Sequence, residues 1–141
     1  MELTTYEEQV SHVTNSERRQ NRVAPARGDA GRALTEAAKA YIEAHSADKF
    51  ALQALADALF VNGSYLLRVF KANTGHTLLW YHNYVRCEKA KALLTQSDSS
   101  ISAVGEEAGF VSSAHFSHVF RKMTGMTPTD YRAGRGNTEA R

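Results

Sequence analysis

The sequence predicts an all-α fold of about seven helices, in which two helix-turn-helix subdomains are joined by a long linker helix. Apolar residues recur at intervals of three and four along most of residues 34–132, which is the spacing of one helical face. One short phrase occurs twice in the chain. Between its two copies lies a long periodic stretch that contains no Gly or Pro.

The phrase SYLLRVFKANTG at residues 64–75 returns as AHFSHVFRKMTG at residues 114–125. The chain therefore contains two related helical modules. Aligning 62–82 with 112–132 gives six identical pairs: Val69/Val119, Phe70/Phe120, Thr74/Thr124, Gly75/Gly125, Thr77/Thr127 and Tyr81/Tyr131.

The first subdomain, residues 34–76, shows three apolar stripes that predict three helices, the last two separated by a tight turn. Ala51 precedes the second helix and offers no side-chain acceptor for a cap, and Phe60 occupies the turn. We therefore expect the first module to be the looser one. The stripes are Leu34, Ala38, Tyr41 and Ile42, then Leu52, Leu55, Ala56 and Leu59, then Leu66, Val69 and Phe70.

The second subdomain, residues 97–134, has stronger local signals. Ser100 is a suitable N-cap for the helix that carries Val104, and Gly109 stands where the chain must turn sharply. Asn62 and Ser112 are predicted to cap the two helices that follow the turns. Residues 135–141 are expected to form a C-terminal tail.

Residues 77–96 connect the modules and predict one linker helix of about 30 Å. This length is close to the ~34–36 Å between successive major grooves on one face of B-DNA. Two modules on such a strut could reach adjacent grooves without dimerising, although a helical bundle that arose by duplication has the same pattern. Residues 1–33 read as a polar N-terminal arm or linker, because Pro25, Gly28 and Gly31 interrupt any helix.

The formal net charge of +2 is unevenly distributed. Residues 1–48 carry six Lys/Arg and eight Asp/Glu, whereas residues 49–141 carry eleven and seven. The basic surplus accompanies the repeat, as expected for a nucleic-acid partner. A single cysteine, Cys87, excludes an internal disulfide and suits a reducing cytoplasm. The sequence predicts neither a signal peptide nor a membrane span.

The chain resembles the DNA-binding domain of the AraC family of bacterial transcription regulators. The resemblance lies in the repeated phrase and in the stretches GFVSSAHFSHVFRKMTGMTPTDYR and YHNYVRCEKAKALL. The resemblance covers about residues 34–132. It implies a seven-helix domain whose third and sixth helices enter DNA, mostly in activators that contact RNA polymerase. Many members carry a further effector or dimerisation domain, so the chain resembles a short stand-alone member or a DNA-binding half. It also implies a Gly where this chain has Phe60 and an Arg where it has His118.

Helical phase predicts which side chains of the two recognition helices face DNA. Arg68 suits a guanine edge or a phosphate, and Leu67 and Ala114 suit thymine methyl groups. Lys71, Lys122 and Arg132 suit phosphates, and Arg86 is expected to bridge modules through a carboxylate. The predicted DNA-binding residues are Ser64, Leu67, Arg68, Lys71, Ser113, Ala114, Ser117, His118, Arg121 and Lys122.

Enzymatic and metal-binding functions find little support. His115 and His118 have a spacing that can ligate a metal, but no Cys or carboxylate pattern completes a site. No Gly-rich phosphate loop or catalytic triad is recognisable, so no cofactor is predicted. The expected function is that of a cytoplasmic, sequence-specific DNA-binding regulator, an activator that binds double-stranded DNA as a monomer unless a further domain dimerises it. The alternative is a helical protein-interaction module without DNA specificity. The operator, the regulated genes and the inducing signal stay open.

Overall fold

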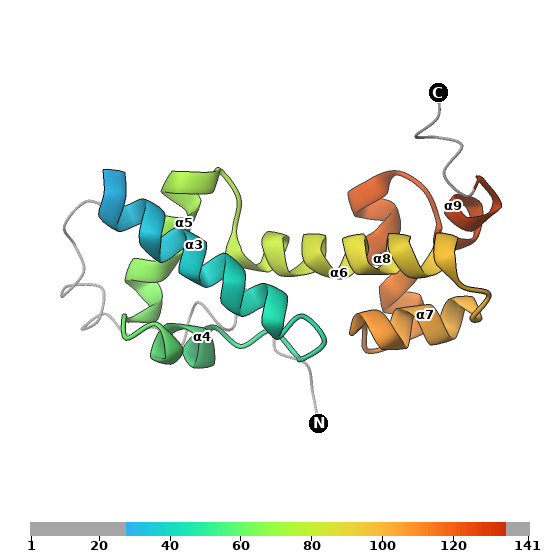
Figure 1. The fold of residues 1–141 in the computed structure, drawn as a ribbon, viewed down its shortest axis with the longest axis horizontal. Coiled ribbons are helices and arrows are strands. Elements are labelled where there is room, and N and C mark those ends of the chain that lie inside the picture. Colours follow the sequence, from blue (N-terminus) through green and yellow to red (C-terminus); the bar gives the residue numbers. More distant parts are fainter. Residues whose placement is uncertain (1–27, 135–141) are drawn as a thin grey trace. The chain divides into compact units, whose positions relative to one another are not determined.

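The computed structural model describes residues 28–134, which form seven helices and no strand (Figure 1). The all-α prediction and the number of helices are therefore confirmed. The helices are α3 (Gly28–Ala44), α4 (Leu52–Ala58), α5 (Gly63–Thr74), α6 (Leu78–Gln96), α7 (Ile101–Ala108), α8 (Ser113–Thr124) and α9 (Pro128–Gly134).

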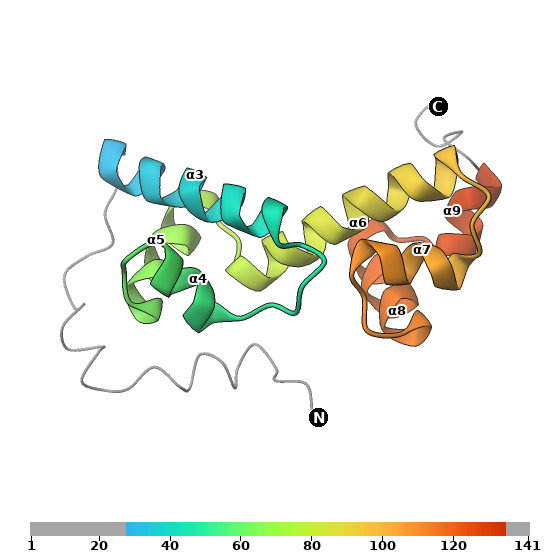
Figure 2. The same cartoon turned by 60° about the horizontal axis from the view of Figure 1, so that its bottom comes forward.

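The chain divides into two compact units, and the division falls inside α6 (Figure 2). Among the described residues, unit 1 comprises 28–45 and Phe50–His82, and unit 2 comprises Ser46–Lys49 and 83–134. The linker predicted over 77–96 is present as the single helix α6. Its two ends belong to different cores.

In unit 1, α3 packs against α5 and α4. The predicted stripes supply the buried side chains, which include Ala38, Ile42, Leu55, Leu66 and Phe70. Asn62 caps α5 by accepting a hydrogen bond from the Tyr65 amide at 3.0 Å, as predicted.

Helix α3 begins at Gly28, so the expectation that the polar arm extends to residue 33 is wrong. Gly31 is buried on the inner face of α3 with Thr35, Ala38 and Ile42, at intervals of four, three and four. Packing of this face against the core overrides the low helix propensity of glycine. Asp29 also favours a helix start, because it lies in the first turn, where the helix dipole favours a negative charge. The rest of the predicted arm, residues 1–27, lies outside the described part of the chain.

In unit 2, α7 and α8 pack closely because Gly105 has no side chain. A Cβ atom at this position would lie 2.6 Å from Cδ2 of Phe116. The caps predicted at Ser100 and Ser112 are confirmed, since each hydroxyl accepts an amide hydrogen bond of 3.0 Å. Gly109 ends α7 with φ +106°, the left-handed conformation that a turn glycine was expected to supply.

The repeated residues form the same local structure in both units. The Thr74 hydroxyl donates to the Phe70 carbonyl at 2.8 Å, and the Thr124 hydroxyl donates to the Phe120 carbonyl at 2.7 Å. Each threonine is followed by a glycine with left-handed φ and then by a threonine that caps the next helix.

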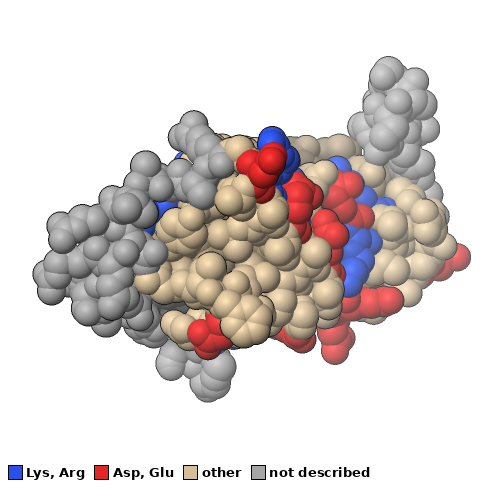
Figure 3. All heavy atoms as spheres, turned by 60° about the vertical axis from the view of Figure 1, so that its left-hand side comes forward, with Lys and Arg blue, Asp and Glu red and all other residues tan. Residues whose placement is uncertain are grey.

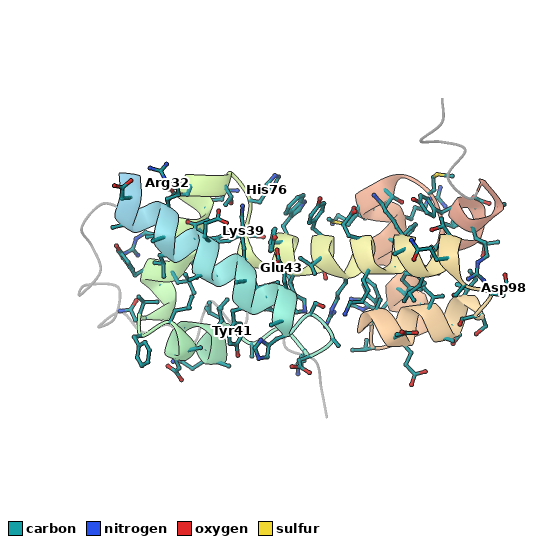
Figure 4. All side chains as sticks on the ribbon, viewed as in Figure 1. Arg32, Lys39, Tyr41, Glu43, His76 and Asp98 are labelled. Carbon is teal, nitrogen blue, oxygen red and sulfur yellow. The ribbon has the colours of Figure 1, made fainter. Side chains whose placement is uncertain are left out.

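The repeated tyrosines are packing anchors, as predicted. The Tyr81 ring meets Phe70 edge to face with centroids 5.9 Å apart, and Tyr131 meets Phe120 in the same way at 5.5 Å. The Tyr81 hydroxyl also donates a hydrogen bond of 2.6 Å to the carboxylate of Glu43 on α3, which is labelled in Figure 4.

Two arginines hold unit 2 together through backbone carbonyls. Arg86 donates to the carbonyls of Ser46 at 2.8 Å and Asp48 at 2.7 Å, so the predicted carboxylate bridge is wrong. Burial lowers the Arg86 pKa to about 10. Arg132 donates to the carbonyl of Leu94 in the last turn of α6 and to those of Ser97 and Ser99 just after it. These bonds give Arg132 a structural role in unit 2.

Candidate nucleic-acid interface

Helix α8 has an apolar inner face and an open polar outer face. Phe116, Val119 and Phe120 are buried in the unit 2 core. The predicted DNA-facing residues lie on the other side: Ser113, Ala114, His118, Arg121 and Lys122 are exposed, and Ser117 is half-buried. The outward orientation predicted for this helix is therefore confirmed.

Helix α5 presents fewer of its predicted residues. Lys71 is exposed, and Leu67 and Arg68 are half-buried. Ser64, however, is only 7% exposed, so its predicted outward position is wrong. Nη1 of Arg68 donates to the Ser64 hydroxyl at 2.9 Å. Residues four apart on a helix are neighbours, and the long arginine therefore covers the short serine.

The guanidinium of Arg68 is only partly satisfied in this conformation. Its Nη2 atom is buried and has no hydrogen-bond partner among the described residues. A bidentate contact with a guanine requires two free donors. Because Nη2 is buried in this conformation, the Arg68 side chain must turn outward before both terminal nitrogens can make that contact.

His115 and His118 lie on α8 in different environments. His118 is exposed, whereas the His115 ring lies edge-on to Phe110 with centroids 5.6 Å apart. Burial lowers the His115 pKa, and the charges of Arg86 and His118 lower it further. His115 thus behaves as a neutral packing residue. The structured part of the chain contains no group of three or more potential metal ligands.

Sequence reasoning did not single out His76, an exposed histidine beside the end of α5 (Figure 4). Its ring stacks on Trp80, with centroids 3.7 Å apart and planes 9° apart. Its amide donates to the Thr74 hydroxyl at 3.0 Å. Helical phase could not have found it, because α5 ends at Thr74 and His76 follows the C-cap Gly75.

The arrangement suits binding rather than catalysis. Two capped helices of equal length each place an outer face opposite a buried apolar stripe. The last turn carries Lys71 in α5 and Arg121 and Lys122 in α8. Such faces offer hydrogen-bond donors and positive charge to a nucleic acid. No helix in the described residues is both long enough and apolar enough to cross a membrane.

Comparison with known proteins identifies the family. A family model described as a helix-turn-helix domain matches residues 55–134, more than half of the chain. A transcriptional regulator from Chromobacterium violaceum with an AraC-type DNA-binding domain matches with a TM-score of 0.71 and 29% identity, covering 77% of this chain and 96% of that one. The chain belongs to the AraC family. The resemblance drawn from the sequence is thereby confirmed.

Two further comparisons concern function. The transcriptional activator RhaS of Escherichia fergusonii is 38% identical over 96 residues, which cover 68% of this chain and 34% of RhaS. The chain thus spans about a third of the length of that relative. The DNA-binding domain of AdpA, solved in complex with a target DNA, matches with a TM-score of 0.67 and 28% identity over 77% of this chain and 96% of that one.

Proposed function

We propose that this chain is a sequence-specific activator of transcription that inserts α5 and α8 into adjacent major grooves of one DNA duplex. The observation that carries the proposal is the exposed outer face of α8, with Arg121 and Lys122 at its end. The AraC-family fold and the DNA complex of the AdpA domain support it. Activation, with RNA polymerase as a partner, is proposed from the likeness to RhaS.

The side chains divide by chemistry into readout and positioning groups. Arg68 reads a guanine edge after leaving Ser64, and Leu67 and Ala114 contact thymine methyl groups. Ser113, Ser117 and His118 supply hydrogen bonds. Lys71, Arg121 and Lys122 bind phosphates, which position the protein without reading sequence. His76 adds a phosphate contact beside α5, since its ring and its backbone are both fixed.

The test is selection of bound sequences from a random duplex pool, followed by gel-shift titration at low salt. The proposal expects one asymmetric motif with two short blocks that a single chain binds. It places this regulator in the cytoplasm. Even nonspecific binding should be visible at low salt. A chain that retards no duplex under those conditions would instead be a helical protein-interaction module.

A further inference from the structure

Ser64 lies one helical turn before Arg68 on α5, and the two side chains are joined. Nη1 of Arg68 donates a hydrogen bond of 2.9 Å to the Ser64 hydroxyl. This bond draws the long arginine side chain back along the helix, and the serine beneath it is only 7% exposed. The structure therefore shows Arg68 in what is here called its inward conformation, with one terminal nitrogen bonded to its own helix.

The second module has the same positions without the hydroxyl. In the repeat, Ser64 corresponds to Ala114, and Arg68 corresponds to His118. Both helices have twelve residues and begin after a side-chain cap, so the helix ends do not distinguish them. Ala114 and His118 are exposed, whereas Ser64 is buried and Arg68 is half-buried. The two modules thus differ in whether a hydroxyl lies one turn before the side chain expected to read a base.

The inward conformation depends on this single hydroxyl. Nη2 of Arg68 is buried without a hydrogen-bond partner among the described residues, and an unsatisfied buried donor raises the free energy of that conformation. Without the Ser64 hydroxyl, Nη1 would lose this partner as well. In the outward conformation water can solvate both nitrogens, so removal of the hydroxyl should turn Arg68 outward.

The charge of Arg68 matters in unit 1 because the basic side chains of α3 are already paired with carboxylates. Figure 3 shows blue and red side chains together at the top of the view. On α5, Arg68 and Lys71 form no ion pair with any described residue. These two side chains therefore carry the positive charge that α5 can offer to DNA. The pairs on α3 are Arg32 with Asp29 at 3.0 Å and Lys39 with Glu36 at 3.5 Å.

We propose that Ser64 is a positioning residue that holds Arg68 inward and so sets how strongly α5 reads its base, an inference that rests on the proposed function. A guanine offers two acceptors to the guanidinium, which together outweigh the one bond to Ser64. A base that offers a single acceptor does not, and Arg68 then keeps its bond to the serine. Helix α8 has no such cost, because position 114 is alanine.

Arginine labelling with phenylglyoxal tests the hold of Ser64 on the free chain, because this reagent adds to accessible guanidinium groups. Peptide mass spectrometry then compares Arg68 with the exposed Arg121 of the same sample. Arg68 should react more slowly than Arg121 in the unaltered chain. Ser64→Ala should raise the rate at Arg68 about fivefold, the population change expected from the loss of one hydrogen bond. Ser64→Cys should act likewise at nearly unchanged volume, because a thiol is a weak acceptor.

Gel-shift titration of the same variants measures the effect on DNA. Ser64→Ala should bind the selected site about fivefold more tightly, because Arg68 no longer gives up a hydrogen bond. The gain on random duplex should be smaller, since few of its sites offer two acceptors to Arg68. In an Arg68→Ala background, Ser64→Ala should change neither affinity. This matched comparison separates an action through Arg68 from a merely structural role of Ser64.

The outcomes separate this proposal from the proposed function. Labelling of Arg68 as fast as that of Arg121 in the unaltered chain would overturn the proposal, as would a labelling rate that both Ser64 variants leave unchanged. A gain in DNA affinity that persists in the Arg68→Ala background would also overturn it. A chain that shows the expected labelling but retards no duplex would contradict the proposed function, while the labelling would still support the hold of Ser64 on Arg68.

Discussion

Arg68 connects the structure of α5 to base recognition, because its side chain must turn away from Ser64 before both terminal nitrogens can reach a base. Arg68→Ala should weaken binding to the selected site by about 1–3 kcal/mol and relax preference at adjacent positions. Lys71→Ala, on the same face, is the control and should weaken all sequences alike and reduce the salt slope by about one. Equal losses on selected and random duplexes would move Arg68 to the phosphate-binding group. Gel-shift titrations at several salt concentrations provide the measurement.

His115 gives unit 2 a pH-dependent stability. Its folded pKa is lowered by burial and by nearby positive charge, so between that value and the unfolded value near 6.5 the unfolded chain binds more protons. The contribution of His115 to the free energy of unfolding should therefore be fully present above about pH 6.5 and should be lost as the pH falls through this window. Urea unfolding at pH 7.5 and pH 5.5 should show the loss.

His115→Phe should remove part of that pH dependence, since a phenyl ring can keep the edge contact with Phe110. His45→Asn, at an exposed histidine of unit 1, should keep it. The charged groups identified around His115 are Arg86 on α6 and His118 on α8. Identical pH profiles for the unaltered chain and His115→Phe would assign the dependence to other groups.

At the scale of the element, α4 lacks the cap that its counterpart α7 has. Ala51 holds an extended conformation with φ −141° and ψ 103° but makes no side-chain cap bond, whereas Ser100 does. Ala51→Ser should stabilise unit 1 by about 1 kcal/mol, and Ser100→Ala should destabilise unit 2 by a similar amount. Calorimetry of both variants measures this. A neutral Ala51→Ser would show that α4 does not limit the stability of unit 1.

The turn after α7 depends on glycine for two separable reasons. Gly109 has positive φ, and a Cβ there would collide with the backbone of residues 46–47. Gly125 has φ +85° but open space around its Cα. Gly125→Ala should therefore cost about 1 kcal/mol from conformation alone, and Gly109→Ala should cost clearly more. Equal losses in urea unfolding would mean that the segment at 46–47 moves aside freely.

At the scale of the whole molecule, the proposed use of two grooves makes the spacing of the DNA site decisive. Inserting five base pairs between the two selected blocks rotates the second by about half a turn. Binding by one chain should then fall to the affinity of a single block. Footprinting of the original and the altered duplex checks this. A ten-base-pair insertion is the comparison, because it returns the second block to the same face of the DNA but leaves it farther from the first block. Unchanged protection after the five-base-pair insertion would exclude simultaneous use of both helices.

The amino-acid sequence by itself determined the features that depend on neighbours along the chain. The helices around Val69 and Val119, the caps at Asn62 and Ser112 and the turn at Gly109 were predictable, because periodicity, capping and positive φ are local properties. The repeat itself identified the two helical faces. It also placed Arg68 and His118 at matching positions.

Only the tertiary structure decided the contacts that join distant segments. Arg86 and Arg132 bind backbone carbonyls, and every residue supplies a carbonyl, so the sequence offers no sign of which ones are used. Ser64 is buried because Arg68 folds back over it rather than outward. Helix α3 starts at Gly28 because packing of its inner face outweighs the glycine penalty. In each case the deciding free energy comes from groups brought together by folding, which local sequence patterns do not record.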